Sequence, residues 1–137
     1  MRAATLAIML LLTGCSGNTP SLCANTLIET KRDPAGPLAA FRYVRDCGAT
    51  ADFAMTVAIG PADKGVAGAR TVFVADSDHG AAETDGKSIW LEMHWASPHM
   101  LSVGYAAKAR VFKRVERAGG AQIAYRATDR MTSPMVD

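Results

Sequence analysis

The chain has 137 residues, which suits one domain and leaves too little length for two separate cores. Apolar residues make up 49% of the composition and charged residues 20%, as in globular proteins and unlike disordered or fibrous ones. The net charge is only +2, and no long block of like charges offers a surface for nucleic acid.

The chain begins with an uncharged apolar segment behind one positive residue. Arg2 precedes the run from Ala3 to Gly14, which contains no charge. As a helix this run rises only about 18 Å, whereas a bilayer span needs roughly 20 apolar residues. A secretion signal explains it better than a transmembrane helix, and no later segment is apolar enough to span a membrane. Residues 1–14 are therefore predicted to be a signal peptide.

At the end of this run, Leu12-Thr13-Gly14-Cys15 resembles the lipobox of bacterial lipoproteins. The resemblance implies that the signal is cut just before Cys15 and that this cysteine carries the lipid, with further acyl chains such as palmitate on the new N-terminus. In that family a residue other than aspartate after the cysteine directs the protein to the outer membrane, and here it is Ser16. The alternative is an ordinary secretory signal followed by a structural cysteine.

Residues 15–22 are expected to form the lipidated cysteine and a flexible tether, because SGNTPS is small, polar and interrupted by proline. The mature domain, residues 23–137, would then face the periplasm. If Cys15 carries lipid, Cys23 and Cys47 remain as one pair in an oxidising compartment and are predicted to form a disulfide. Two free thiols or a metal pair are the weaker alternative, since no further cysteine completes a zinc site.

Short runs with a period of two follow one another along the mature chain. The clearest is Phe53 to Ile59, where bulky residues alternate with small ones. Similar alternation recurs around Ile89 to Trp95, Leu101 to Tyr105, and Ile123 to Tyr125. Less regular strands are expected at Thr26 to Lys31, Leu38 to Arg45, Arg70 to Ala75 and Ala109 to Val115.

Glycine and proline interrupt these runs too often for long helices. The breaks at Ser97-Pro98 and Gly119-Gly120 are short enough to be hairpin turns, which join antiparallel strands. The pattern predicts an all-β fold: an antiparallel meander of seven or eight short strands that forms a curled sheet, a small sandwich or a barrel.

The run Arg45-Asp46-Cys47-Gly48-Ala49-Thr50, a strand with Thr56 and Val57, and a later Ala-Arg-Val-Phe run together resemble a group of small uncharacterised exported bacterial proteins. That resemblance covers most of the mature domain and implies a compact envelope module without naming a chemistry. The chain departs from the group at Asp33-Pro34-Ala35-Gly36, where a Pro-Asp-Gly turn is expected.

No metal site, cofactor or catalytic set is predicted. Asp76-Ser77-Asp78-His79 begins like a calcium loop, but Gly80 and Lys87 stand where oxygen ligands are needed. Glu92-Met93-His94 lacks the H-E-x-x-H spacing of zinc proteases, and no serine lies in G-x-S-x-G.

One surface patch is a candidate binding site. If Ile89, Leu91, Met93 and Trp95 face the core, then Trp90, Glu92 and His94 project from the opposite side of the strand. An indole with polar neighbours is common at binding hot spots. The alternative is that Trp90 packs beneath a loop or against a second sheet.

The sequence therefore favours a lipid-anchored periplasmic protein that binds another envelope component or supports an assembly, an inhibitor or immunity role being one form of this. The alternative from another class is a small envelope hydrolase, with Glu92 and His94 or Asp76 and His79 as an acid-base pair.

Overall fold

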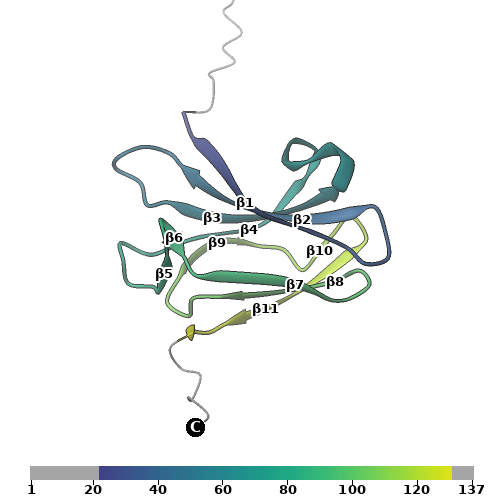
Figure 1. Ribbon diagram of the computed structural model, residues 1–137. Helices are drawn as coiled ribbons and strands as arrows, with labels where there is room; N and C mark the ends of the chain where they lie inside the picture. The colour runs from purple at the N-terminus through teal and green to yellow at the C-terminus, as the bar shows by residue number, and fades with distance from the viewer. Residues whose placement is uncertain (1–21, 131–137) are drawn as a thin grey trace, which may run out of the picture.

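The computed structural model describes residues 22–130 (Figure 1). The predicted signal peptide, Cys15 and all of the tether but Leu22 lie outside these residues. The regular structure of the described part consists of strands and two short 3-10 helices, so the predicted all-β class is confirmed. Its elements are β1 (Ala24–Arg32), β2 (Leu38–Asp46), β3 (Ala54–Pro61), η1 (Ala62–Lys64), η2 (Val66–Gly68), β4 (Arg70–Asp76), β5 (Thr84–Asp85), β6 (Ser88–Ile89), β7 (Leu91–Ser97), β8 (Met100–Tyr105), β9 (Arg110–Arg114), β10 (Arg117–Ala118) and β11 (Ala121–Ala127).

The strands form two facing sheets and a small hairpin. One sheet has the order β1-β2-β3-β4-β9, the other has the order β10-β11-β8-β7, and β5 pairs with β6. Figure 1 shows the two sheets as an upper and a lower layer, with the β5–β6 hairpin at one end. Of the forms expected from the sequence, the domain adopts the sandwich.

Both predicted hairpins are present. The break at Ser97-Pro98 joins β7 to β8, and that at Gly119-Gly120 joins β10 to β11, each pair antiparallel. The expected count of seven or eight strands also holds if the two-residue strands β5, β6 and β10 are set aside. Two strands joined by a tight turn must lie next to each other, and these pairs could therefore be predicted.

The meander differs from the prediction at two pairs. After β8 the chain crosses to the other sheet, where β9 pairs with β4, and it then returns so that β11 lies parallel to β8. The register runs from Gln122 opposite Met100 to Ala127 opposite Tyr105. Strands that follow one another along the chain are not neighbours here, and alternation within a strand carries no information about such a crossover.

The core lies between the two sheets and contains the alternating bulky residues. Phe73, Leu101 and Val103 are fully buried there, and the Tyr105 ring packs at a tilt against Phe73, with the ring centroids 4.8 Å apart. Successive strand side chains point to opposite faces, so the period-two pattern selects the inner face. The predicted members that are buried in the core are Met55, Val57, Ile59, Ile89, Leu91, Met93, Leu101, Val103, Tyr105 and Ile123.

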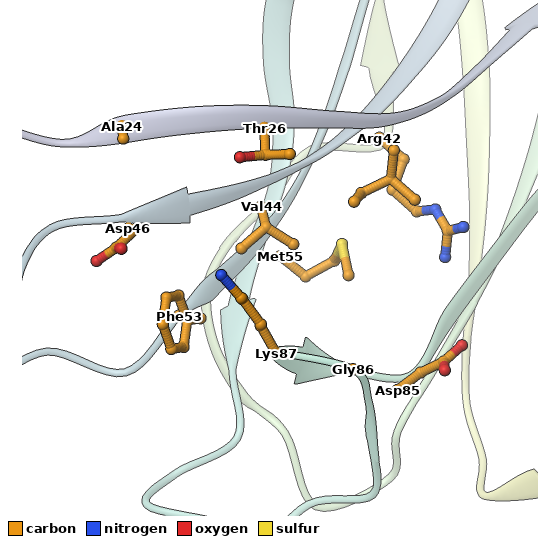
Figure 2. Close-up of a pocket in the computed structure, with 11 residues that line it drawn as sticks. Ala24, Thr26, Arg42, Val44, Asp46, Phe53, Met55, Asp85, Gly86 and Lys87 are labelled. Carbon is orange, nitrogen blue, oxygen red and sulfur yellow. The ribbon is translucent and has the colours of Figure 1, made fainter.

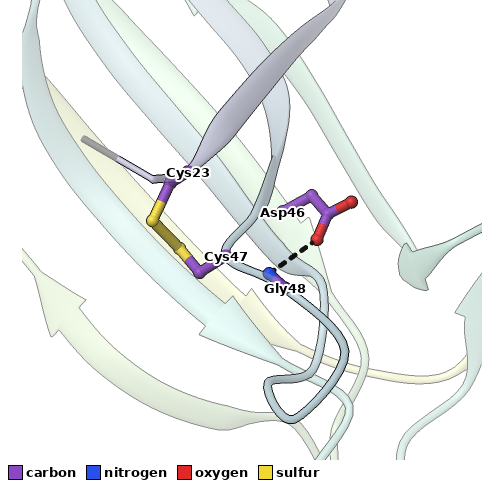
Figure 3. The surroundings of a disulfide bond; sticks show 4 residues. All are labelled: Cys23, Asp46, Cys47 and Gly48. Atoms are coloured by element: carbon purple, nitrogen blue, oxygen red, sulfur yellow. Dashed lines mark hydrogen bonds between the residues drawn. A yellow bond between two sulfur atoms is a disulfide. The ribbon is translucent and has the colours of Figure 1, made fainter. Parts of the chain in front are cut away.

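A disulfide joins Cys23, just before β1, to Cys47, just after β2 (Figure 3). It spans 24 positions of the sequence. Cross-linking a loop of that length stabilises a fold by about 3–4 kcal/mol in chain-entropy theory. Beside it, the Gly48 amide donates a 3.0 Å hydrogen bond to Asp46 Oδ1, which shapes the turn that follows β2. The bridge holds the start of the edge strand β1 against β2.

Candidate functional site

A groove opens between the inner face of β1 to β3 and the turn of the β5–β6 hairpin (Figure 2). Its volume is about 410 Å³, within the range of pockets that hold small ligands or single bulky side chains. Its walls come from three separate parts of the chain: β1 and β2, the start of β3, and the hairpin turn. The lining residues are Ala24, Thr26, Ile28, Arg42, Val44, Asp46, Phe53, Met55, Asp85, Gly86 and Lys87.

Hydrogen bonds tie the two sheets together beside the second half of β1. Near its C-terminal end, Trp95 on β7 donates an indole hydrogen bond of 2.9 Å to the Lys31 carbonyl. Arg42 on β2 reaches across to donate to the Leu91 carbonyl and also lies 3.2 Å from a Glu29 carboxylate oxygen. Among residues 22–130 no hydrogen bond joins the first half of β1 to β7, and the groove opens beside this half.

The floor of the groove is apolar. Val44 and Met55 lie side by side on β2 and β3, both nearly buried, and Phe53 stands beside them. The Lys87 side chain extends from the hairpin turn toward these apolar residues, and its Nζ lies 5.6 Å from the centroid of the Phe53 ring (Figure 2). A cation over a ring face is held by electrostatic attraction without being neutralised.

Four charged residues line the groove, and three of them already have charged or hydrogen-bonding partners. Asp46 accepts the Gly48 amide, Asp85 lies 3.7 Å from Arg130, and Arg42 pairs with Glu29. Lys87 forms no ion pair within residues 22–130. Lys87 is therefore the lining charge that can pair with a ligand without first losing a carboxylate partner.

The lining combines apolar side chains with a hydroxyl and four charged groups. No histidine, cysteine or serine is among the lining residues, so these walls hold neither a Ser-His nor a Cys-His pair. An apolar floor with a few placed polar groups is the usual composition of a ligand site. What the groove provides is apolar contact area, the Thr26 hydroxyl and the Lys87 ammonium group.

The structure separates the three residues of the predicted binding patch. Glu92 and His94 are exposed on one face of β7, as the alternation predicts. Trp90 is only 7% exposed, and its ring lies beneath the Arg130 guanidinium group, 5.7 Å away. Trp90 falls in the break between β6 and β7, so the alternation does not continue through it. The packed position, which was the alternative for this indole, is the one found.

Neither proposed acid-base pair lies in the groove. Glu92 and His94 stand on the exposed face of β7, with Glu92 3.4 Å from Arg126. Asp76 forms two hydrogen bonds with Arg110, of 3.1 and 2.6 Å, while the 74% exposed His79 side chain lies 3.4 Å from Asp52 instead.

The partners of Asp76 determine its protonation. Burial by itself acts to raise the pKa of Asp76, but hydrogen bonds from Arg110 and the Asp78 amide outweigh it and hold the pKa below the ordinary 3.8. The same pairing raises the pKa of Arg110. Asp76 is therefore ionised at neutral pH and has no proton to donate there.

A second buried carboxylate, that of Asp33, connects the turn after β1 to the turn between β7 and β8. Asp33 accepts hydrogen bonds from the Ala35 and His99 amides, and its Oδ2 lies 2.7 Å from His99 Nδ1. Burial acts to raise the pKa of Asp33, yet these hydrogen bonds more than offset it, and the pKa stays below 3.8. They also hold His99 at a φ of 64° in the turn between β7 and β8.

The groove was not predicted from the sequence, although Phe53 and Met55 were expected on a strand. Asp85-Gly86 is a turn signal that could have revealed the β5–β6 hairpin. Nothing local indicates that this hairpin lies opposite β1. Within residues 22–130 no group of three or more His, Cys, Asp or Glu side chains is placed to hold a metal ion.

Comparison with protein-family models, with curated proteins and with solved structures finds no match to this chain. Within the described residues, no helix has the length and apolar character needed to cross a membrane.

Proposed function

We propose that this protein is a lipid-anchored lipoprotein of the bacterial cell envelope whose β-sandwich binds another envelope component without catalysing a reaction. The observation that carries the proposal is the groove between β1 and the β5–β6 turn, with its apolar floor and the unneutralised Lys87. A role as an inhibitor or immunity protein is one form of such binding.

The anchor and the groove lie close together along the chain. Cys15 is the proposed lipid attachment point, and Ala24, the first groove residue, follows nine positions later. A fully extended chain of that length spans at most about 30 Å. Several acyl chains on one N-terminus hold a protein stably at a bilayer. A groove on so short a tether meets components at or near the periplasmic surface of the outer membrane.

A hydrolase has less support from the same side chains. Its two proposed acid-base pairs are not among the groove residues, and both Asp76 carboxylate oxygens accept hydrogen bonds from Arg110. The exposed Glu92 and His94 lie on the outer face of a strand and line none of the three main pockets of residues 22–130. Acid-base catalysis needs both groups within hydrogen-bonding reach of one bound substrate.

In-cell photo-crosslinking tests this proposal. In the test variant a photoreactive residue replaces Ile28, which lines the groove and is 48% exposed. In the control variant it replaces Phe112 on β9, which is 60% exposed at the opposite edge of the same sheet. We expect a discrete adduct from position 28 and none from position 112. Equal adducts from both positions, or none from position 28, would refute binding at the groove.

The anchor is tested separately by intact-mass analysis of the membrane fraction. The expected product begins at Cys15 and carries acyl chains, and Cys15→Ser releases the protein from the membrane. An unmodified soluble product that begins elsewhere would overturn the anchoring.

A further inference from the structure

The four outer edges of the two sheets are protected to different degrees. Exposed strand edges pair readily with other chains, and proteins guard them with charge or with very short strands. Three of the five residues of β9 are Arg or Lys, β10 has only two residues, and β7 carries the exposed Glu92 and His94. The first half of β1, the edge segment Ala24–Ile28, has five uncharged residues that are all exposed.

The edge segment is also unusually apolar for an open edge. Leu27 is 53% exposed and Ile28 is 48% exposed, and they are among the few large hydrophobic side chains of residues 22–130 that face solvent. The rest of β1 is charged at Glu29, Lys31 and Arg32 and is tied to β7 through the Lys31 carbonyl. A bulge separates the two halves between Leu27 and Glu29. Only the first half of β1 is therefore open for a further strand.

The edge segment borders the groove directly. Ala24, Thr26 and Ile28 line the groove, and Figure 2 shows Thr26 pointing from β1 toward it. A strand added beside β1 would continue the sheet, and every second side chain of that strand would point to the same side. Strand addition of this kind draws affinity from backbone hydrogen bonds and specificity from pockets for alternate side chains.

We propose that the groove and the edge segment together bind an extended polypeptide by strand addition. The bound peptide pairs its backbone with Ala24–Ile28, places one bulky apolar side chain in the mouth of the groove beside Thr26 and Ile28, and presents an acidic side chain to Lys87. This inference rests on the proposed binding function and specifies its partner as an extended peptide segment of another protein.

A peptide fits the groove and the edge segment better than an acyl chain or a second copy of this chain. An acyl chain would use the apolar floor alone, and the lining charges, two of each sign, give no net positive charge to attract its head group. A second copy of this chain would bring its own β1, where Ile28 is the only bulky groove-facing residue. The nearest carboxylate, Glu29, is already engaged by Arg42 and Lys31, so a second copy leaves Lys87 unpaired.

Selection from a phage-displayed library of linear peptides tests the inference. The target is the full mature chain with Cys15→Ser, purified from the periplasm with its Cys23–Cys47 bridge intact. We expect enriched peptides in which one bulky apolar residue recurs close to an acidic residue. A scan that methylates one backbone nitrogen at a time should weaken binding about tenfold at every second position, because alternate amides face β1.

Matched variants locate the binding site on the protein. Ile28→Glu should abolish binding of the selected peptides, while Val111→Glu, a similarly exposed position on β9, should leave it intact. Lys87→Ala should weaken binding of peptides with the acidic residue and should not affect versions in which that residue is alanine. Thermal unfolding of each variant confirms that the fold is retained, which is expected because these side chains are exposed.

Several results would overturn the inference. The selection could enrich no peptide, or the methylation scan could weaken binding equally at every position. Ile28→Glu and Val111→Glu could also reduce peptide binding equally. A dimer in light scattering that Ile28→Glu dissociates would assign the edge to a second copy, and displacement of a bound fluorescent fatty acid without peptide binding would assign the groove to acyl chains. If no peptide binds but the adduct from position 28 persists in cells, the strand-addition inference fails and the proposed binding function stands.

Discussion

Removing the Cys23–Cys47 bridge should destabilise the domain and, more specifically, loosen the first half of β1. The bridge spans 24 positions, for which chain-entropy theory gives about 3–4 kcal/mol at 25 °C. Small domains are stable by only about 5–15 kcal/mol, so this is a large share of the total. We therefore expect the double variant Cys23→Ser, Cys47→Ser to unfold at a much lower urea concentration than the parent.

The loosening should be local as well as global. Next to the bridge, β1 begins with Ala24 opposite Asp46 and continues to Leu27 opposite Tyr43. The second half keeps its own fastening through the Trp95 indole and the Lys31 carbonyl. Amide hydrogen exchange in the double variant should therefore accelerate over residues 24–27 more than over residues 29–32.

Urea unfolding and amide exchange, both in the Cys15→Ser background, check the two parts of this prediction. A loss of less than about 1 kcal/mol would show that the bridge adds little to the strand pairing that already holds the loop. Uniform exchange along β1 would refute the idea that the two halves of the strand are fastened independently.

Three further changes test other parts of the structure. Asp76 stabilises the fold fully above its unfolded pKa of 3.8, and this contribution is lost as the pH falls through its lower folded pKa. Asp76→Asn should therefore lower the unfolding temperature at pH 7. In this variant the unfolding temperature should also fall less between about pH 5 and pH 2 than it does in the parent. His99→Gly should be more stable than His99→Ala by about 1 kcal/mol in urea unfolding, because both remove the ring while only glycine tolerates a φ of 64°, and equal stability would exclude strain at this turn. Gly60→Ala should cost about 1–3 kcal/mol, because its Cβ would lie 2.6 Å from the Ala69 Cα. Gly104→Ala, whose Cβ would meet only the flexible Glu92 side chain, should cost less than Gly60→Ala in the same assay, and the reverse order would contradict the packing argument.

Much of the fold could be predicted because its signals are local. Alternation along Phe53 to Ile59 selects an inner face whatever the neighbouring strand is, and Ser97-Pro98 forces β7 against β8. The disulfide was predicted by counting cysteines once Cys15 is assigned to the lipid, and that count needs no knowledge of the fold. The candidate site was less accessible, since the groove draws Ile28, Phe53 and Lys87 from segments that are far apart in the sequence.

The sequence by itself determined the all-β class, the buried faces of the main strands, both hairpins and the pairing of Cys23 with Cys47. Only the tertiary structure decided that β11 runs parallel to β8, that Trp90 is buried under Arg130, and that the first half of β1 is left open beside a groove. Strand periodicity and tight turns are fixed by the geometry of a few neighbouring residues. Crossovers and grooves depend on which distant faces bury each other most completely, and no short stretch of the chain contains that information.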